Sequence, residues 1–127
     1  NLDISSENID NFWLVGHSEI NQFEQIEFLK KLYNSQLPIT SRTEQVFKEM
    51  FISEQSEYHT LRAKTGMTFG DYGKGYNGWY VGYVESKDNV FFFATNISPA
   101  INYHNSFNNK RKSITINALI ELGFING

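Results

Sequence analysis

Three segments in the middle of the chain are rich in aromatic and β-branched side chains, and this feature limits the possible folds most. The segments are residues 58–65, 77–85 and 90–97. Such runs are typical of strands, and three in succession with short connections favour an antiparallel meander. A glycine-rich stretch, residues 67–77, forms the first connection, and residues 86–89 form a tighter second turn.

Helical patterns precede this predicted sheet. From Asn21 to about Asn34 apolar side chains recur at helical spacing, and Asn21 with Glu24 three residues later is a capping-box pattern. Ser41 with Glu44 repeats that pattern at the start of a second, shorter helical segment. We therefore expect two helices before the first strand.

A further helix is predicted after the sheet. Residues 98–109 are rich in Asn and Ser and are predicted to be a loop, whereas the chain from Lys110 has a helical pattern up to a C-cap at Gly123. The expected fold class is α+β, an antiparallel β-sheet flanked by helices. With 127 residues and no inter-domain linker, the chain is expected to form one domain, residues 1–127.

Composition and charge argue against several classes of function. A net charge of -3 gives no general attraction to a phosphate backbone, so no nucleic-acid partner is expected. Cysteine is absent from the sequence, and His17, His59 and His104 are scattered without carboxylates at ligand spacing. We therefore expect no metal site. The opening residues do not have the basic and apolar pattern expected of a secretion signal, and no apolar run reaches the roughly 18–20 residues that a membrane helix needs.

Two blocks of sequence indicate chemistry. Residues Leu61 to Gly66 read L-R-A-K-T-G, and residues Asn77 to Glu85 read N-G-W-Y-V-G-Y-V-E. Lys-Thr-Gly alone is a weak signal, but the two blocks together closely resemble the corresponding strands of class D, or oxacillinase-type, serine β-lactamases. They also resemble strands of the penicillin-binding sensor domains of β-lactam receptor proteins, although L-R-A-K-T-G and the F-W-L segment at residues 12–14 are closer to the enzymes.

The resemblance extends over nearly the whole chain. The further matching blocks are Asn1, Ile4 with Ser5, Phe12 to Leu14, Glu24 to Tyr33, and Arg111 to Ile114. Asn1 matches the last residue of the family's Tyr-Gly-Asn motif. The resemblance implies the C-terminal portion of the serine β-lactamase and penicillin-binding transpeptidase-like fold, so that 1–127 would be a single partial domain without the half that bears the nucleophile.

The resemblance also implies a substrate-binding set on the Lys-Thr-Gly strand. A β-lactam or a peptidoglycan stem carries a carboxylate, and by resemblance Lys64, Thr65 and Arg111 would bind it through charge-assisted hydrogen bonds. Gly66 has no side chain and would let the ligand lie along the strand. Without the resemblance, Lys64 would be interpreted as a solvated strand residue and Arg111 as a surface residue.

Two catalytic roles follow from the same resemblance. The backbone N–H of Met67 would donate to the oxyanion of the tetrahedral intermediate. The family usually has an aromatic residue at this position, which leaves the substrate range open. Trp13 matches the tryptophan that donates to a carbamylated lysine, the family's general base, although packing in a core is the alternative role for its ring.

A serine nucleophile needs a lysine three residues after it on one helix face, and no serine in this chain has one. We expect the nucleophile and the base, a lysine carbamylated by CO2, to lie upstream of Asn1, and this chain alone to be inactive. No other cofactor is expected. The intact protein is expected to be a periplasmic or secreted bacterial enzyme that hydrolyses β-lactam antibiotics and confers resistance.

Two other functions and one question of assembly remain open. The chain could come from a receptor whose sensor domain stays acylated, or its two tryptophans and seven tyrosines could form a platform for sugars. The expected partners are β-lactams and the N-terminal half of the same fold, in cis or from another chain. Half a sheet exposes strand edges, so a homo-oligomer or swapped dimer is also expected.

Overall fold

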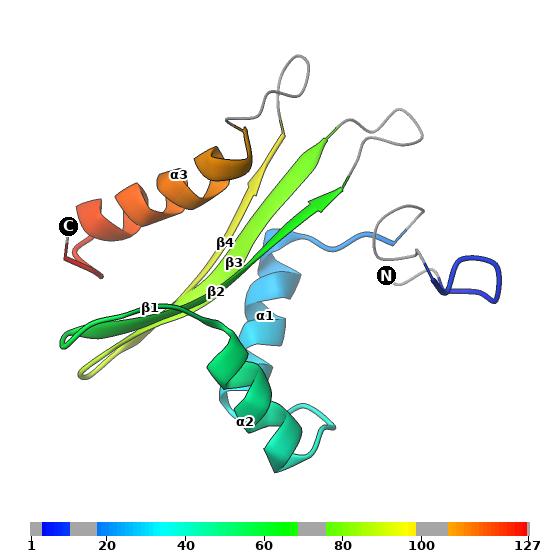
Figure 1. Ribbon diagram of the computed structural model, residues 1–127, viewed down its shortest axis with the longest axis horizontal. Coiled ribbons are helices and arrows are strands. Elements are labelled where there is room, and N and C mark those ends of the chain that lie inside the picture. The colour runs from blue at the N-terminus through cyan, green and yellow to red at the C-terminus, as the bar shows by residue number, and fades with distance from the viewer. Residues whose placement is uncertain (1–3, 11–17, 69–75, 99–106, 127) are drawn as a thin grey trace.

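The computed structural model describes residues 4–10, 18–68, 76–98 and 107–126. The described strands form one four-stranded antiparallel sheet in the order β1-β2-β3-β4. Their bounds are β1 Ile52–Gln55, β2 His59–Thr68, β3 Asn77–Ser86 and β4 Val90–Ile97. Helix α3 (Phe107–Glu121) covers one face, and α1 (Gln22–Tyr33) with α2 (Ser41–Met50) lies on the other side (Figure 1). The predicted α+β class with a sheet flanked by helices is confirmed.

The strand pattern differs from the prediction in two places. No strand was predicted before residue 58, but Ile52–Gln55 form β1, which pairs with β2 with a bulge between Ile52 and Glu54. All four β1 side chains are exposed, so this strand has no alternating burial that the sequence could reveal. Strand β2 also continues to Thr68, and Lys-Thr-Gly therefore lies inside a paired strand and not at its end.

The two faces of the sheet bury separate clusters. On the α3 face, Leu61 of β2 and Val84 of β3 are fully buried against Leu119. On the opposite face, Tyr83 packs against Leu29 of α1 and Phe51. Alternate residues of a strand point to opposite faces, so the neighbours Tyr83 and Val84 supply one core each.

The first two helices begin with side-chain caps. The Asn21 capping box is confirmed, because Asn21 Oδ1 accepts from the Glu24 N–H at 3.0 Å and Glu24 Oε2 accepts from the Asn21 N–H at 2.8 Å. In α2 the predicted N-cap, Ser41, is wrong by one residue. Thr40 caps this helix by accepting from the Thr43 N–H at 3.2 Å, and the Glu44 carboxylate turns away to other partners.

Helix α3 begins three residues before the predicted start. Its buried residues follow one row at a spacing of four: Phe107, Arg111, Thr115 and Leu119. Because two of these four buried residues are polar, the row does not appear as an apolar pattern in the sequence. At the other end Gly123 has φ +74°, and the Phe124 N–H donates to the Leu119 carbonyl at 2.9 Å. The predicted glycine C-cap is confirmed.

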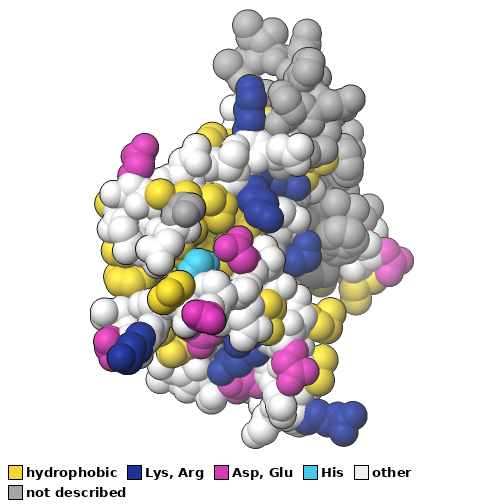
Figure 2. Space-filling model, turned by 60° about the vertical axis from the view of Figure 1, so that its left-hand side comes forward, with side chains coloured by type: hydrophobic (Ala, Val, Ile, Leu, Met, Phe, Trp, Pro, Cys, Tyr) yellow, Lys and Arg dark blue, Asp and Glu magenta, His cyan; other side chains and the backbone are white. Residues whose placement is uncertain are grey.

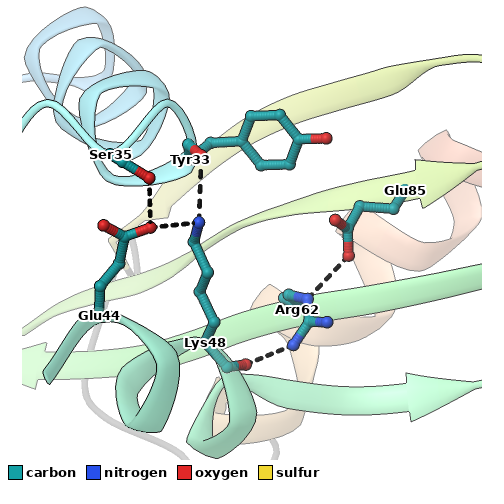
Figure 3. A network of polar contacts seen from close by, with 6 residues as sticks. All are labelled: Tyr33, Ser35, Glu44, Lys48, Arg62 and Glu85. Carbon is teal, nitrogen blue, oxygen red and sulfur yellow. Dashed lines mark hydrogen bonds and ion pairs between the residues drawn. The ribbon is translucent and has the colours of Figure 1, made fainter. Parts of the chain in front are cut away.

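Helix α2 turns its polar side toward the rest of the molecule. Lys48 Nζ donates to the Tyr33 carbonyl at 3.1 Å and pairs with Glu44, which also accepts from Ser35 Oγ (Figure 3). The Arg62 guanidinium donates to the Lys48 carbonyl. These polar contacts attach α2, none of whose residues is buried, to α1 and β2.

Candidate functional site

Strand β2 carries the Lys-Thr-Gly residues in a regular antiparallel register. Lys64 pairs with Val81, Thr65 with Tyr80, and Gly66 with Trp79. Lys64 is exposed, and its Nζ donates to the Thr65 carbonyl at 2.7 Å. Because side chains alternate, Lys64 and Thr65 point to opposite faces of the sheet. The ammonium and the hydroxyl therefore do not share one face.

Arg111 lies on α3, the helix that comes after β4 in the chain, and its side chain reaches β2. Its Nη1 donates to the Gly66 carbonyl at 2.8 Å, although the two residues are far apart in the sequence. Only 9% of the Arg111 surface is exposed. The structure thus brings two of the predicted binding residues, Gly66 and Arg111, into direct contact.

The electrostatic setting of Arg111 is unusual for a buried cation. Its Nε is buried and has no hydrogen-bond partner among the described residues. Within that part of the chain, Arg111 forms no ion pair. The ion pairs there join glutamates to Lys30, Lys48, His59 and Arg62. A buried guanidinium without a carboxylate is costly, so this site is suited to an anionic group that would complete it.

The turn of helix before Thr115 is fixed to the sheet by two hydroxyl groups. Thr115 Oγ1 donates to the Arg111 carbonyl at 2.9 Å and lies 2.6 Å from Thr95 Oγ1 of β4. Thr115 is buried, with 3% of its surface exposed. These bonds hold the backbone of Arg111 at a defined place above the sheet.

Met67 and Trp13 are the two residues predicted to act in catalysis. Met67 is half-buried in β2 and pairs with Gly78, and its predicted role as an oxyanion donor stays a prediction. Trp13 lies outside the described residues. Tyr80, opposite Thr65, is buried, and this burial raises the pKa of its phenol, so the group next to Thr65 is neutral at neutral pH.

Sequence reasoning missed two residues beside Arg111. Phe107 was assigned to a loop and Gly78 was given no role, yet the Phe107 ring and the Arg111 stem both lie over Gly78. The spacing of four between Phe107 and Arg111 was the available signal, because such residues share a helix face.

A separate surface hollow of about 450 Å³ lies between α2, the connection that precedes it and β2. Its lining residues are Ser35, Ile39, Ser41, Glu44, Gln45, Lys48, Glu49 and Arg62. No predicted site residue borders it. Within the described ranges, no cluster of His, Cys, Asp or Glu could hold a metal ion. The helices in those ranges do not have the length and hydrophobicity of a transmembrane span.

The family relationship follows from comparison with known proteins. The family model for the penicillin binding protein transpeptidase domain matches residues 1–120. The chain belongs to this transpeptidase family. Its relatives include class D β-lactamases: it is 43% identical over 97 residues to β-lactamase OXA-48 of Klebsiella pneumoniae, an alignment covering 76% of this chain and 36% of that protein.

A regulatory protein and a solved structure extend this comparison. The regulatory protein BlaR1 of Bacillus licheniformis is 36% identical over 87 residues, covering 68% of this chain and 14% of that protein. The crystal structure of a class D β-lactamase from Sebaldella termitidis superposes with a TM-score of 0.86 at 40% identity, over 97% of this chain and 49% of that one. The chain therefore spans half or less of the length of these family members, and its fold is part of the class D fold.

Proposed function

We propose that this chain is the C-terminal part of a class D-like serine β-lactamase and supplies the side of the active site that binds the carboxylate of the β-lactam. The contact between Arg111 and Gly66 carries this proposal. A guanidinium that is buried at the Lys-Thr-Gly strand and lacks a carboxylate partner among the described residues is suited to a ligand's carboxylate.

Each proposed binding group has a distinct part in ligand binding. A carboxylate lying along the edge of β2, beyond its pairing with β1, would be reached by the Arg111 guanidinium and the Thr65 hydroxyl from one face and by the Lys64 ammonium from the other. Gly66 leaves room for the ligand beside the strand. The Met67 backbone N–H would then point to the carbonyl oxygen that becomes negative in the tetrahedral intermediate.

The N-terminal half of the same fold would complete the reaction. We assign to it the serine that is acylated and a lysine that is carbamylated by CO2 and acts as the general base. In this chain, Trp13 would donate its indole N–H to that carbamate. The 127 residues by themselves would then have no hydrolytic activity.

Hydrolysis of the chromogenic cephalosporin nitrocefin by the full-length protein tests the proposal. We expect turnover that bicarbonate stimulates, since bicarbonate supplies the CO2 for carbamylation. The 127-residue chain, assayed in parallel, should show no turnover. A full-length protein that neither hydrolyses nitrocefin nor is acylated by it would refute the proposed function.

A second candidate function is that of a sensor domain that is acylated and stays acylated. The similarity to BlaR1 favours this alternative. The two functions differ in deacylation, which depends on the general base. A fluorescent penicillin that remains covalently bound after many hours would identify a sensor, whereas rapid loss of the label with release of hydrolysed product would identify an enzyme.

We also propose a periplasmic or secreted location for the intact protein.

We further propose that the isolated chain associates with itself. Figure 2 shows hydrophobic side chains at several places on one face of the molecule. Large exposed apolar residues include Phe23, Met50 and Leu122, with 82%, 78% and 65% of their surfaces exposed. Among the described strands β4 lies at the end of the sheet, and an unpaired strand edge together with exposed apolar side chains promotes association. Light scattering should show dimers or larger species, and a clean monomer would contradict this expectation.

A further inference from the structure

Helix α3 lies close to the sheet at Gly78. Phe107 begins the helix and is buried, with 5% of its surface exposed, and Arg111 follows one turn later on the same side. Beneath them, Gly78 of β3 pairs with Met67 of β2, next to Gly66. The first turn of α3 therefore lies over the part of the sheet that carries the Lys-Thr-Gly strand.

This close approach depends on the missing side chain of Gly78. A Cβ atom added there would lie 3.1 Å from Cε1 and Cζ of the Phe107 ring and 3.5 Å from Cδ of Arg111. The ring and the arginine stem thus share the space above one bare backbone position. Real Cβ atoms seldom have neighbours at 3.1 Å, so the ring would have to shift by a few tenths of an ångström to admit a Cβ at position 78.

The ring restricts the conformations open to the arginine. An arginine side chain has many rotamers, and fixing one of them carries an entropic cost. Because the Phe107 ring and Cδ of Arg111 both lie within 3.5 Å of one point above Gly78, the ring would exclude conformations in which the arginine side chain swings toward it. The remaining conformation places Nη1 2.8 Å from the Gly66 carbonyl.

We propose that Phe107, packed on the bare backbone of Gly78, is a positioning residue that directs the Arg111 guanidinium to the carboxylate-binding end of the Lys-Thr-Gly strand. This inference rests on the proposed function, since it names what gives that site its preference for an anionic ligand. Phe107 itself would not touch the ligand.

The test compares a cephalosporin with its own C4 methyl ester in the full-length protein. Wild type should prefer the free carboxylate, and Phe107→Leu should reduce the ratio of the two kcat/KM values about tenfold, through the KM of the carboxylate form. Phe124→Leu is the matched control, because Phe124 stacks on Phe91 with ring centroids 3.8 Å apart, beyond the C-terminal end of α3. An unchanged ratio in Phe107→Leu would overturn the proposal.

Gly78→Ala provides a second variant. It keeps the Phe107 ring but shifts it away from position 78. It should lower the same ratio, and retention of the wild-type ratio by this folded variant would count against the proposal. The Nε–H signal of Arg111 in a ¹⁵N NMR spectrum, assigned by its loss in Arg111→Lys, gives a readout that needs no turnover. It should shift in Phe107→Leu and Gly78→Ala but not in Phe124→Leu.

The two readouts separate the possible failures. If wild type reacts with neither form of the cephalosporin while the Nε–H signal moves as expected, the proposed function is wrong and the positioning role stands. If wild type discriminates strongly but the signal is the same in all the variants, the positioning role is wrong.

Discussion

Arg111 of α3 donates a hydrogen bond of 2.8 Å to the carbonyl of Gly66 in β2, joining residues that are 45 positions apart in the chain. The bond connects a helix to the one strand segment whose sequence indicates ligand binding. Because the guanidinium is buried and has donors to spare, it is both a structural tie and the strongest candidate for binding an anion.

Removal of this guanidinium should weaken ligand binding. In the full-length protein, Arg111→Ala is expected to lower kcat/KM for a carboxylate-bearing β-lactam about 10- to 100-fold, which corresponds to a charge-assisted hydrogen bond of roughly 1.5–3 kcal/mol. Steady-state kinetics would measure this. Arg42→Ala is the control, because Arg42 is an exposed arginine of α2. Equal kinetics in both variants would contradict the assignment.

The hydroxyl pair Thr95 and Thr115 should be energetically coupled. Thr115→Val leaves the part-buried Thr95 hydroxyl without this partner, at an expected cost of about 1–3 kcal/mol, whereas Thr95→Val leaves Thr115 its bond to the Arg111 carbonyl and should cost less. The double variant removes both groups and should cost less than the sum of the single changes. Urea unfolding of the four proteins forms a double-mutant cycle, and strict additivity would exclude coupling.

Much of the fold could be predicted from the sequence because local signals agree with the tertiary structure. The turn at residues 86–89, the cap at Asn21 and the C-cap at Gly123 each rest on contacts close in sequence. Strand β1 could not be predicted, since its side chains are all exposed and only pairing with β2 defines it.

The candidate site could be predicted in part for a similar reason. The motif identified Lys64 to Gly66, and the resemblance added Arg111, but neither could reveal that Arg111 is buried or that Lys64 and Thr65 face opposite sides of the sheet. The contact with Gly66 depends on where α3 crosses β3, which is decided by packing at Gly78. Long-range packing of this kind leaves no local pattern in the sequence.

Two glycines should respond very differently to alanine. At Gly123 an added Cβ meets nothing within 4 Å, so Gly123→Ala should cost only the strain of the positive φ, about 1 kcal/mol. At Gly82 the Cβ would lie 2.1 Å from the Arg62 carbonyl oxygen, and the strands would have to separate. Thermal unfolding should show a small loss for Gly123→Ala and severe destabilisation for Gly82→Ala; equal losses would contradict this packing.

The buried phenol of Tyr83 should make the fold sensitive to alkali. Tyr83 is 1% exposed, and burial raises the pKa of its phenol from 10.0 to about 12. The unfolded chain therefore ionises first, so the stability linked to this group is complete below pH 10 and is lost as the pH rises toward 12. The loss over that interval should be roughly 2–3 kcal/mol.

Tyr83→Phe tests this linkage, because phenylalanine keeps the packed ring and removes the ionisable group. Urea unfolding should show nearly equal stabilities of wild type and variant at neutral pH, and a more stable variant at about pH 11. Tyr80 is also buried with a raised pKa, so the variant should retain part of the alkaline slope. Tyr58→Phe, at a position with 69% of its surface exposed, is the control. If Tyr83→Phe and wild type lose stability in parallel as the pH rises, the Tyr83 phenol is not the group responsible.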